Sequence, residues 1–228
     1  MSSAREAREM LRAHRYGALS TLSKKFDGYP FGSITPYLVD HDGSLIILIS
    51  TLAEHTKNIQ NNPRVSLITH NQSNPEIQTQ GRATVIGDAN RIDDREQAGV
   101  RYLRYFPEAK TYMGMHDFSF YRIAPVAIRF IGGFGKIHWA DLTEYVPKNF
   151  EVYAQQETRL LATLNIQQQS ALLLLLKEQH GVNASVVQAI GLDCDGVDVR
   201  SEEQVWRLKF AEGLPDPVQA TDVLTNPA

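Results

Sequence analysis

Residues Leu48-Ile-Ser-Thr-Leu-Ala-Glu-His-Thr-Lys-Asn-Ile-Gln-Asn-Asn-Pro63 lead from an apolar strand pattern straight into a short helix. Proline disfavours helical geometry in the residue before it, so the helix, expected over 53–60, must end ahead of Pro63. The first turn of such a helix has unpaired backbone N–H groups and a partial positive charge, and both favour an anion. The side chains that would complete an anion site here are those of Ser50, Thr51, His55, Thr56 and Lys57. The alternative is an ordinary N-cap, in which a hydroxyl binds only the backbone of its own helix.

Short runs rich in Ile, Val, Thr and aromatic residues lie on both sides of this segment and predict strands. They cover 17–22, 31–39, 44–50, 64–69, 77–86, 118–123 and 126–130, and Pro125 separates the last two. Turn sequences such as Asp27-Gly28 and Asp42-Gly43 join neighbouring runs, as in antiparallel sheets. A charged amphipathic helix begins the chain, and the apolar spacing over 93–106 predicts another helix. Six or seven antiparallel strands with few helices predict a small closed or split barrel.

The composition changes around 141–147, where a second unit is expected to begin. Helices are predicted over 150–164 and 167–180, and Gly181 is placed to end the latter. Strands are predicted over 186–192 and 205–210, flanking a turn at Asp195-Gly196, with a short helix over 217–224. We therefore expect two domains, residues 1–145 and a smaller one at 146–228.

Composition and charge narrow the functional classes. The formal charge of −3 leaves no basic field of the kind that non-specific nucleic-acid binding needs. The longest apolar run, 171–176, is far shorter than the roughly 20 residues of a membrane span. The single cysteine, Cys194, lies between two aspartates, so we expect an unreactive thiol. The expectation is a soluble cytoplasmic protein with neither a nucleic-acid nor a membrane partner.

Several segments, taken in order, resemble a known family. Gly17-Ala-Leu-Ser-Thr-Leu22, Asp27-Gly-Tyr-Pro-Phe-Gly-Ser33, the 50–63 segment and Arg64-Val-Ser-Leu-Ile68 resemble the pyridoxamine 5′-phosphate oxidase-like FMN-binding family. The segments at 112–125 and 132–139 are similar to its haem-utilisation (HugZ-type) branch. This resemblance implies an α+β fold, an antiparallel split β-barrel of the FMN-binding type followed by a smaller α/β domain. It also implies a homodimer whose ligand site takes residues from both subunits.

The resemblance implies FMN as the cofactor, with haem as the alternative. It places the five residues named in the 50–63 segment where that fold receives the FMN phosphate or the acidic groups of another ligand. Ser33, with Gly28 and Pro30, would shape the neighbouring hairpin, although a turn and a strand start explain these residues equally well. An arginine on a strand, Arg122 or Arg129, is suited to a propionate or phosphate, and exposure to solvent is the alternative for both.

The chain also departs from the branch that it resembles. Haem-degrading members bind iron through a histidine in a C-terminal extension, and here no histidine follows His180. We therefore expect no haem degradation by that mechanism, and a relocated iron ligand would be His116 or His138. No pair of histidines has the spacing of a helical metal site, so no metal ligand is assigned, and motifs of serine hydrolases or nucleotide triphosphatases are also missing.

The sequence thus predicts a homodimeric flavin- or haem-binding protein of the haem-utilisation family with an oxidoreductase-type role. Two alternatives stay open, a haem-degrading oxygenase with a relocated ligand and a non-catalytic carrier or regulator of flavins or tetrapyrroles. A flavin or haem supplies its own redox chemistry, so a catalytic set of side chains is not required. Whether the protein is an enzyme is therefore undecided, and no catalytic residue is assigned.

Overall fold

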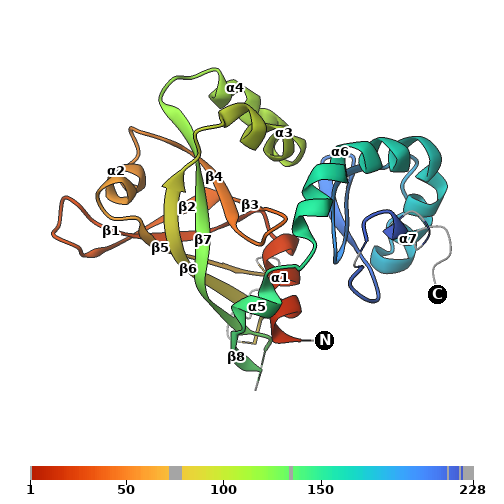
Figure 1. Cartoon of the computed structure of the whole chain (residues 1–228), viewed down its shortest axis with the longest axis horizontal. Helices are drawn as coiled ribbons and strands as arrows, with labels where there is room; N and C mark the ends of the chain where they lie inside the picture. The colour runs from red at the N-terminus through yellow and green to blue at the C-terminus, as the bar shows by residue number, and fades with distance from the viewer. Residues whose placement is uncertain (1, 72–78, 134–135, 215, 221, 223–228) are drawn as a thin grey trace. The chain divides into compact units, whose positions relative to one another are not determined.

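The computed structural model describes residues 2–71, 79–133, 136–214, 216–220 and 222, and it divides into two compact units, Met1–Val146 and Pro147–Ala228 (Figure 1). The division lies beside the domain boundary expected near residue 145. The first unit holds α1 (Ser3–Ala13), β1 (Tyr16–Leu22), β2 (Pro30–Pro36), β3 (Leu38–Val39), β4 (Leu45–Ser50), α2 (Glu54–Asn61), β5 (Arg64–His70), β6 (Arg82–Arg91), α3 (Arg95–Tyr105), η1 (Pro107–Ala109), α4 (Lys110–Met113), β7 (Phe118–Ile131), β8 (Ile137–Ala140) and α5 (Leu142–Tyr145). The second holds α6 (Phe150–Gln167), α7 (Gln169–His180), β9 (Gln188–Asp193), β10 (Gly196–Ser201) and β11 (Gln204–Lys209).

The sheet of the first unit curls into a barrel. Its strand order is β2-β1-β5-β6-β7-β4-β3, with β8 added to β7, and the paired strands are antiparallel. β2 and β3 lie at opposite ends of this order, yet only Tyr37 separates them in the chain. One residue spans less than about 4 Å, so the two ends of the sheet must lie next to each other. This is the predicted α+β fold with an antiparallel split barrel, and the expected strand 31–39 is divided because the chain passes from one end to the other.

The inner face of the barrel is a continuous apolar layer. Leu19, Leu67, Val85 and Ile128 stand directly opposite one another across β1, β5, β6 and β7, and all four are fully buried. They alternate along their strands with more exposed neighbours, as the two-residue period of a strand requires. α1 adds Ala4, Ala7 and Leu11 to the same core.

Pro125 does not end a strand as predicted, because β7 runs unbroken from Phe118 to Ile131. The pairing with β6 shifts register there: Ile86 stands opposite Ala127, and Gly87 opposite Pro125. One extra residue, Val126, therefore bulges out of β7. A proline lacks the backbone N–H of a regular ladder, and a bulge is one of the few places in a sheet that tolerates it.

Gly87 makes the bulge possible. A Cβ added there would lie 2.2 Å from the carbonyl oxygen of Ala124. We expect Gly87→Ala to lower the free energy of unfolding by about 2 kcal/mol, as overpacking against backbone does. Urea denaturation followed by the fluorescence of Trp139 measures this change. Gly114→Ala is the control, because its added Cβ comes no closer than 3.4 Å to its neighbours, and equal stability of the two variants would contradict this account.

Two other strand predictions need correction. The strand predicted over 77–86 is β6, which begins at Arg82 and continues to Arg91; residues 77 and 78 lie outside the described residues. β8 was not predicted, because its short Ile-His-Trp-Ala sequence follows a glycine-rich segment and carries little strand pattern.

In the second unit, two helices and a three-stranded antiparallel sheet of order β11-β10-β9 enclose their own core. Gly181 ends α7 with φ 69°, in the left-handed conformation predicted for it. The two strands predicted here are β9 and β11, but β10 was missed. The prediction placed only the Asp195-Gly196 turn between those two strands, whereas β10 follows this turn with Asp198 buried beside Arg207. The helix predicted over 217–224 falls partly outside the described residues.

The helices predicted at the start of the chain and over 53–60, 93–106, 150–164 and 167–180 are all present, with ends shifted by a few residues. α4 and α5 are single turns of four residues that the sequence did not indicate. Within the described ranges, no helix is long and apolar enough to cross a membrane.

Candidate functional site

α2 is joined to the turn between β1 and β2 by one buried side chain, Asn58. Its Nδ2 donates to Thr21 Oγ1 at 3.0 Å, and its Oδ1 accepts from the backbone N–H of Lys24 at 2.9 Å. The side chain is fully buried, so both bonds are shielded from water. Asn58 therefore fixes the start of the turn, with its two lysines, beside the helix.

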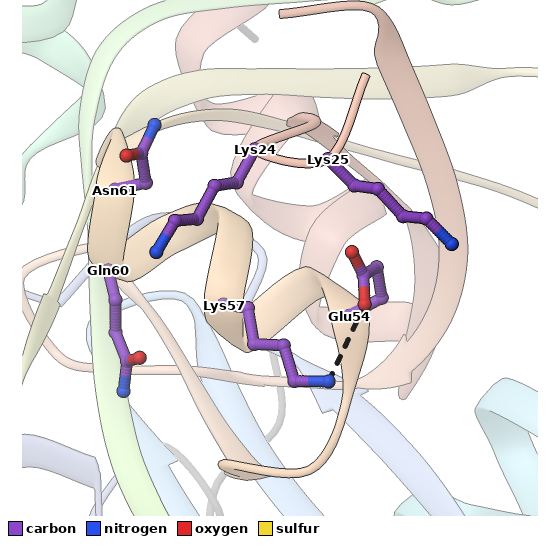
Figure 2. A pocket seen from close by; sticks show the side chains of 6 residues that line it. All are labelled: Lys24, Lys25, Glu54, Lys57, Gln60 and Asn61. Carbon is purple, nitrogen blue, oxygen red and sulfur yellow. Dashed lines mark ion pairs between the residues drawn. The ribbon is translucent and has the colours of Figure 1, made fainter. Parts of the chain in front are cut away.

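The result is a lysine pocket, defined here as the hollow lined by Lys24, Lys25, Glu54, Lys57, Gln60 and Asn61. It encloses about 470 Å³. Figure 2 shows Lys24 extending from the turn and Lys57 extending from α2 toward Glu54, while Lys25 extends in another direction. Lys57 Nζ lies 3.6 Å from Glu54 Oε2. Three amines against one carboxylate give the pocket a positive balance in a chain whose net charge is −3.

The same turn also carries large apolar side chains. A second hollow of about 470 Å³, the aromatic pocket, is lined by Ser23, Phe26, Asp27, Tyr29, Pro30 and Phe31. The side chains of Phe26 and Tyr29 are 58% and 73% exposed, which is unusual for rings of this size. Exposed apolar groups gathered in one place mark a binding surface more often than an ordinary one. The β1–β2 turn therefore carries both amines and exposed aromatic rings, and the Lys25 amine lies over the Phe26 ring, 5.3 Å from its centroid.

His55 and Ser33 are brought into contact by the packing of α2 against β2. His55 Nδ1 lies 3.1 Å from Ser33 Oγ. Burial lowers the pKa of His55 below its ordinary value, so the imidazole is neutral at neutral pH. Glu54, which precedes His55, lines the lysine pocket, and Phe31, two residues before Ser33, lines the aromatic pocket. The pair itself lines neither pocket.

Ser50 and Thr51 are held by Asp117 instead of capping α2. Ser50 Oγ donates to Asp117 Oδ2 at 2.6 Å and accepts from Leu52 N at 3.0 Å, while Thr51 N donates to the Asp117 carbonyl at 2.8 Å. The N-cap of α2 is Ala53, which has no side-chain hydrogen bond to offer. The ordinary N-cap interpretation is therefore wrong, and the Ser50 hydroxyl is already engaged within the chain.

Thr56 points inward. Its side chain is fully buried, and among the described residues Oγ1 has no hydrogen-bond partner. Lys57, the next residue, lies on the exposed face of α2 in the lysine pocket. Two residues predicted to act together thus lie on different faces of the helix.

Arg122 is not brought to this site. It stands opposite Ile46, four residues along β4 from Ser50, and donates to Asp40 at 2.7 Å and Asp42 at 2.8 Å, as well as to Ser44. Burial alone would raise the pKa of Asp40, but a hydrogen bond from His41 and the charges of Arg101 and Arg122 hold it well below its usual range. The structure therefore gives Arg122 a partner set of its own.

The other residues singled out from the sequence lie elsewhere. His116 and His138 are exposed, and the guanidinium of Arg129 lies over the ring of Trp139 at 5.1 Å. In the second unit, ligand atoms of Asp193, Cys194 and Asp195 lie within 4.8 Å of one another. Arg207 already binds Asp193 there, so this group offers no open metal site.

The arrangement is suited to a ligand that is flat and apolar at one end and acidic at the other. Rings stack on the aromatic pocket, and carboxylates or phosphates pair with the amines of the lysine pocket. Of the residues that line the lysine pocket, sequence reasoning named Lys57 and did not name Lys24 or Lys25, nor did it name Asn58, which holds the turn against α2. The one sequence feature that could have indicated these residues is the Lys24-Lys25 pair beside a predicted turn. Nothing in the sequence predicted that this turn packs against α2.

Comparison with known proteins agrees with the fold. The family model for the CREG β-barrel matches residues 1–147. The chain is 31% identical over 229 aligned residues to the chloroplastic heme oxygenase HOZ of Arabidopsis thaliana, covering 97% of this chain and 70% of that protein. This similarity spans both units.

Two solved structures extend the comparison. The protein Atu2129 of Agrobacterium tumefaciens str. C58, of unknown function, superimposes with a TM-score of 0.80 at 24% identity, over 98% of this chain and 94% of the other. The heme binding protein from Mycobacterium smegmatis gives a TM-score of 0.60 at 25% identity, over 99% and 95%. The first supports the fold alone, since its identity is low.

Proposed function

The chain belongs to the CREG β-barrel family, and on that premise we propose that it is a haem-binding protein whose ligand lies against α2 and the β1–β2 turn. The carrying observation is that Lys24 and Lys25 of this turn and Lys57 of α2 line one hollow, while exposed aromatic rings of the same turn line a second one. Haem has this division of chemistry, a large flat apolar ring with two propionates at one edge. The names of the Arabidopsis and Mycobacterium relatives support the same ligand.

The residues present fit haem in the following way. Phe26, Tyr29 and Phe31 offer rings for stacking, and Lys24 and Lys57 offer amines on separate elements that match two separate carboxylates. Bound haem would supply a redox-active iron, while the chain binds, orients and shields the ring. The oxidoreductase-type role expected from the sequence would then come from the iron.

FMN is the second candidate ligand. Lys57 and the N-terminal N–H groups of α2 favour a phosphate there. The Ser50 hydroxyl of the expected phosphate site is already engaged, however, since it donates to Asp117. The Lys57–Glu54 pair would have to be shared with a phosphate and with a propionate alike, so the preference for haem rests on Ser50 and on the names of the relatives.

We also propose a homodimer with the site shared between subunits. The outward face of the barrel supports it, because paired residues Ile34, Ala18, Ile68, Thr84, Arg129 and Trp139 cross six strands in one row. The adjacent row is Gly32, Ser20, Ser66, Ile86 and Ala127. Antiparallel sheets normally present polar side chains to water on such a face. Here Arg129 is the one charged residue in the two rows, so the face resembles one that a partner covers.

Haem degradation is the enzymatic alternative, and the 31% identity with a heme oxygenase over nearly the whole chain favours it. The sequence predicts no use of a C-terminal histidine, so a relocated iron ligand would be His116 or His138. A non-catalytic carrier uses the same binding residues. Incubation with haemin and a reductant in air separates the two, because degradation removes the Soret band and releases iron, whereas a carrier retains both.

The test of haem binding uses the lysine pocket. We expect the full chain to bind haemin and the triple variant Lys24→Gln/Lys25→Gln/Lys57→Gln to bind it about 10- to 100-fold more weakly at low salt, as three exposed ion pairs of about 0.5–1 kcal/mol each predict. Titrations followed at the Soret band, with FMN fluorescence titrations in parallel, measure both ligands.

The control replaces three lysines outside the pocket, in Lys110→Gln/Lys148→Gln/Lys177→Gln, and removes the same net charge. Equal losses in the two triple variants would point to overall charge and contradict a defined site. Tight FMN binding without a haemin complex would replace haem by FMN as the ligand.

A further inference from the structure

The three-stranded sheet of the second unit has two edges, β9 and β11, on either side of β10. An edge strand presents backbone N–H and C=O groups that no neighbouring strand pairs, and these groups can bind a strand of another chain. The hazard is greatest at β9. Residues 186–192, Val-Val-Gln-Ala-Ile-Gly-Leu, contain no charged residue and no proline, which is the composition of segments that pair between chains.

Asn165 of α6 binds both edge groups of Ala189 on β9. Its Nδ2 donates to the Ala189 carbonyl at 3.0 Å, and its Oδ1 accepts from the Ala189 N–H at 2.7 Å. Two residues that face each other in an antiparallel ladder exchange the same pair of bonds. The amide of Asn165 therefore occupies the place that a residue of an added strand would take.

Other helix side chains bind the neighbouring backbone groups of this edge. Gln169 Nε2 donates to the Val187 carbonyl at 2.9 Å, and Glu157 Oε1 accepts from the Leu192 N–H at 3.0 Å. The register shift between β9 and β10 leaves one extra residue, Ile190, in β9, and a bulge also disfavours pairing with a further strand. Side chains from α6 and α7 thus hold the edge of β9 at three successive positions.

The opposite edge, β11, is closed in the same way from α7. Gln179 Nε2 donates to the Lys209 carbonyl at 3.0 Å, and its Oε1 accepts from the Lys209 N–H at 2.8 Å. His180 Nε2 lies 2.9 Å from the Arg207 carbonyl. Each edge is therefore met by one amide, from a different helix, that makes the same two bonds to a single strand residue. Packing of helices on a sheet requires neither pair of bonds, so the repetition indicates that closing the edges is their role.

We propose that Asn165 and Gln179 close the sheet of the second unit to strands of other chains, so that this unit recognises no partner by strand addition. Association of the protein is then left to other surfaces, such as the outward face of the barrel. The inference is independent of the ligand and goes beyond the proposed function. The alternative is that the two amides serve only the stability of their unit, and the experiment separates these roles.

The test asks whether an opened edge binds a strand. The probe is a fluorescent peptide with the sequence of residues 186–192 and a solubilising lysine tail, and the protein is the full chain with Asn165→Leu. Leucine keeps the branched shape of asparagine without its hydrogen-bonding groups. We expect the variant to bind the peptide at least about 10-fold more tightly than the wild type, because two edge groups are freed. Fluorescence anisotropy measures the binding.

Two further measurements follow the freed edge directly. The Ala189 amide of Asn165→Leu should exchange with solvent about 10-fold faster than in the wild type, because its hydrogen bond is lost. Sedimentation velocity should show larger species for Asn165→Leu, and also for Gln179→Met, which opens the other edge. Both measurements use the intact protein under conditions in which it is folded.

Leu161→Ala is the first control, because it removes a buried side chain of α6 and leaves Asn165 in place. If it binds the peptide as Asn165→Leu does, the peptide recognises partly unfolded chains, and the proposal is overturned. Gln155→Leu, on the exposed face of the same helix, adds an equal apolar side chain without freeing an edge group and should behave as the wild type.

Asn165→Asp covers the case in which the leucine variant folds poorly. It keeps an acceptor for the Ala189 N–H but no donor for the carbonyl, so its peptide affinity should lie between those of the wild type and Asn165→Leu. The proposal is also overturned if folded variants of Asn165 bind the peptide no better than the wild type. A protein that binds no haemin leaves this result unaffected, since the probe involves the second unit alone.

Discussion

Arg207→Met is expected to lower the free energy of unfolding of the second unit by about 3–5 kcal/mol, the usual cost of breaking a buried ion pair on one side. Arg207 Nη2 lies 2.5 Å from Asp193 Oδ1, and Nη1 lies 2.8 Å from Asp193 Oδ2 and 3.2 Å from Asp198 Oδ2. The three side chains are 5%, 2% and 3% exposed. Removing the guanidinium leaves the carboxylates of Asp193 and Asp198 in the same dry interior without the positive charge of Arg207.

The same geometry predicts that substitutions in this cluster lower the free energy of unfolding by different amounts. Asp193 binds Arg207 through both oxygens, whereas Asp198 makes one longer contact, so Asp198→Asn should cost less than Arg207→Met. Arg159→Met, on the exposed face of α6, is the control for loss of an arginine and should change stability by less than about 0.5 kcal/mol.

The two tryptophans allow a clean measurement, since Trp139 lies in the first unit and Trp206 in the second. In a Trp139→Phe background, urea denaturation followed by fluorescence reports the second unit alone. If Arg207→Met lowers the free energy of unfolding by less than about 1 kcal/mol, the buried ion pair contributes no more than an ion pair on the surface.

The regular parts of the fold follow from local patterns, and the exceptions follow from tertiary contacts. β1 and β5 were found because one face of each is apolar with a two-residue period, β4 because Leu45–Ile49 is a continuous apolar run, and α2 because Pro63 ends it. Pro125 misled the prediction, since a glycine on the neighbouring strand accommodates it. β10 was missed because the sequence does not show that Asp198 is buried. Its partner, Arg207, comes from β11 and lies beside it only in the folded unit.

The candidate site also depends on tertiary contacts that local sequence patterns do not contain. The 50–63 segment was recognised from the order of its residues, and the contact of His55 with Ser33 agrees with their joint assignment. The prediction treated neighbours in sequence as neighbours in space, however, and the helical turn puts Thr56 in the core and Lys57 in the pocket. Lys24 reaches that pocket only because Asn58 ties the turn to α2. No local pattern contains such a long-range bond.

The largest effect on assembly is expected for Ile34→Asp. Ile34 is 66% exposed and begins the row on the outward face of the barrel that ends at Trp139, and Ile86, 40% exposed, lies in the row beside it. A homodimer with two-fold symmetry places this face against its own copy, so one substitution introduces two charges into one interface. Because each buried unpaired charge costs several kcal/mol, dimerisation should weaken by at least about 1,000-fold, or about 4 kcal/mol.

Light scattering and sedimentation equilibrium over a range of concentrations measure this change, and Val100→Asp is the matched control. Val100 lies on α3, is 57% exposed and belongs to neither row, so its charge should leave the dimer intact. If the ligand site is shared, Ile34→Asp should lose haemin affinity along with dimerisation while Val100→Asp keeps both.

A wild type that is monomeric at micromolar concentration would contradict the shared-site model. An Ile34→Asp variant that dimerises with unchanged affinity would place the interface on another face. Retained haemin binding by a monomeric Ile34→Asp variant would instead mean that α2 and the β1–β2 turn of one subunit suffice to hold the ligand.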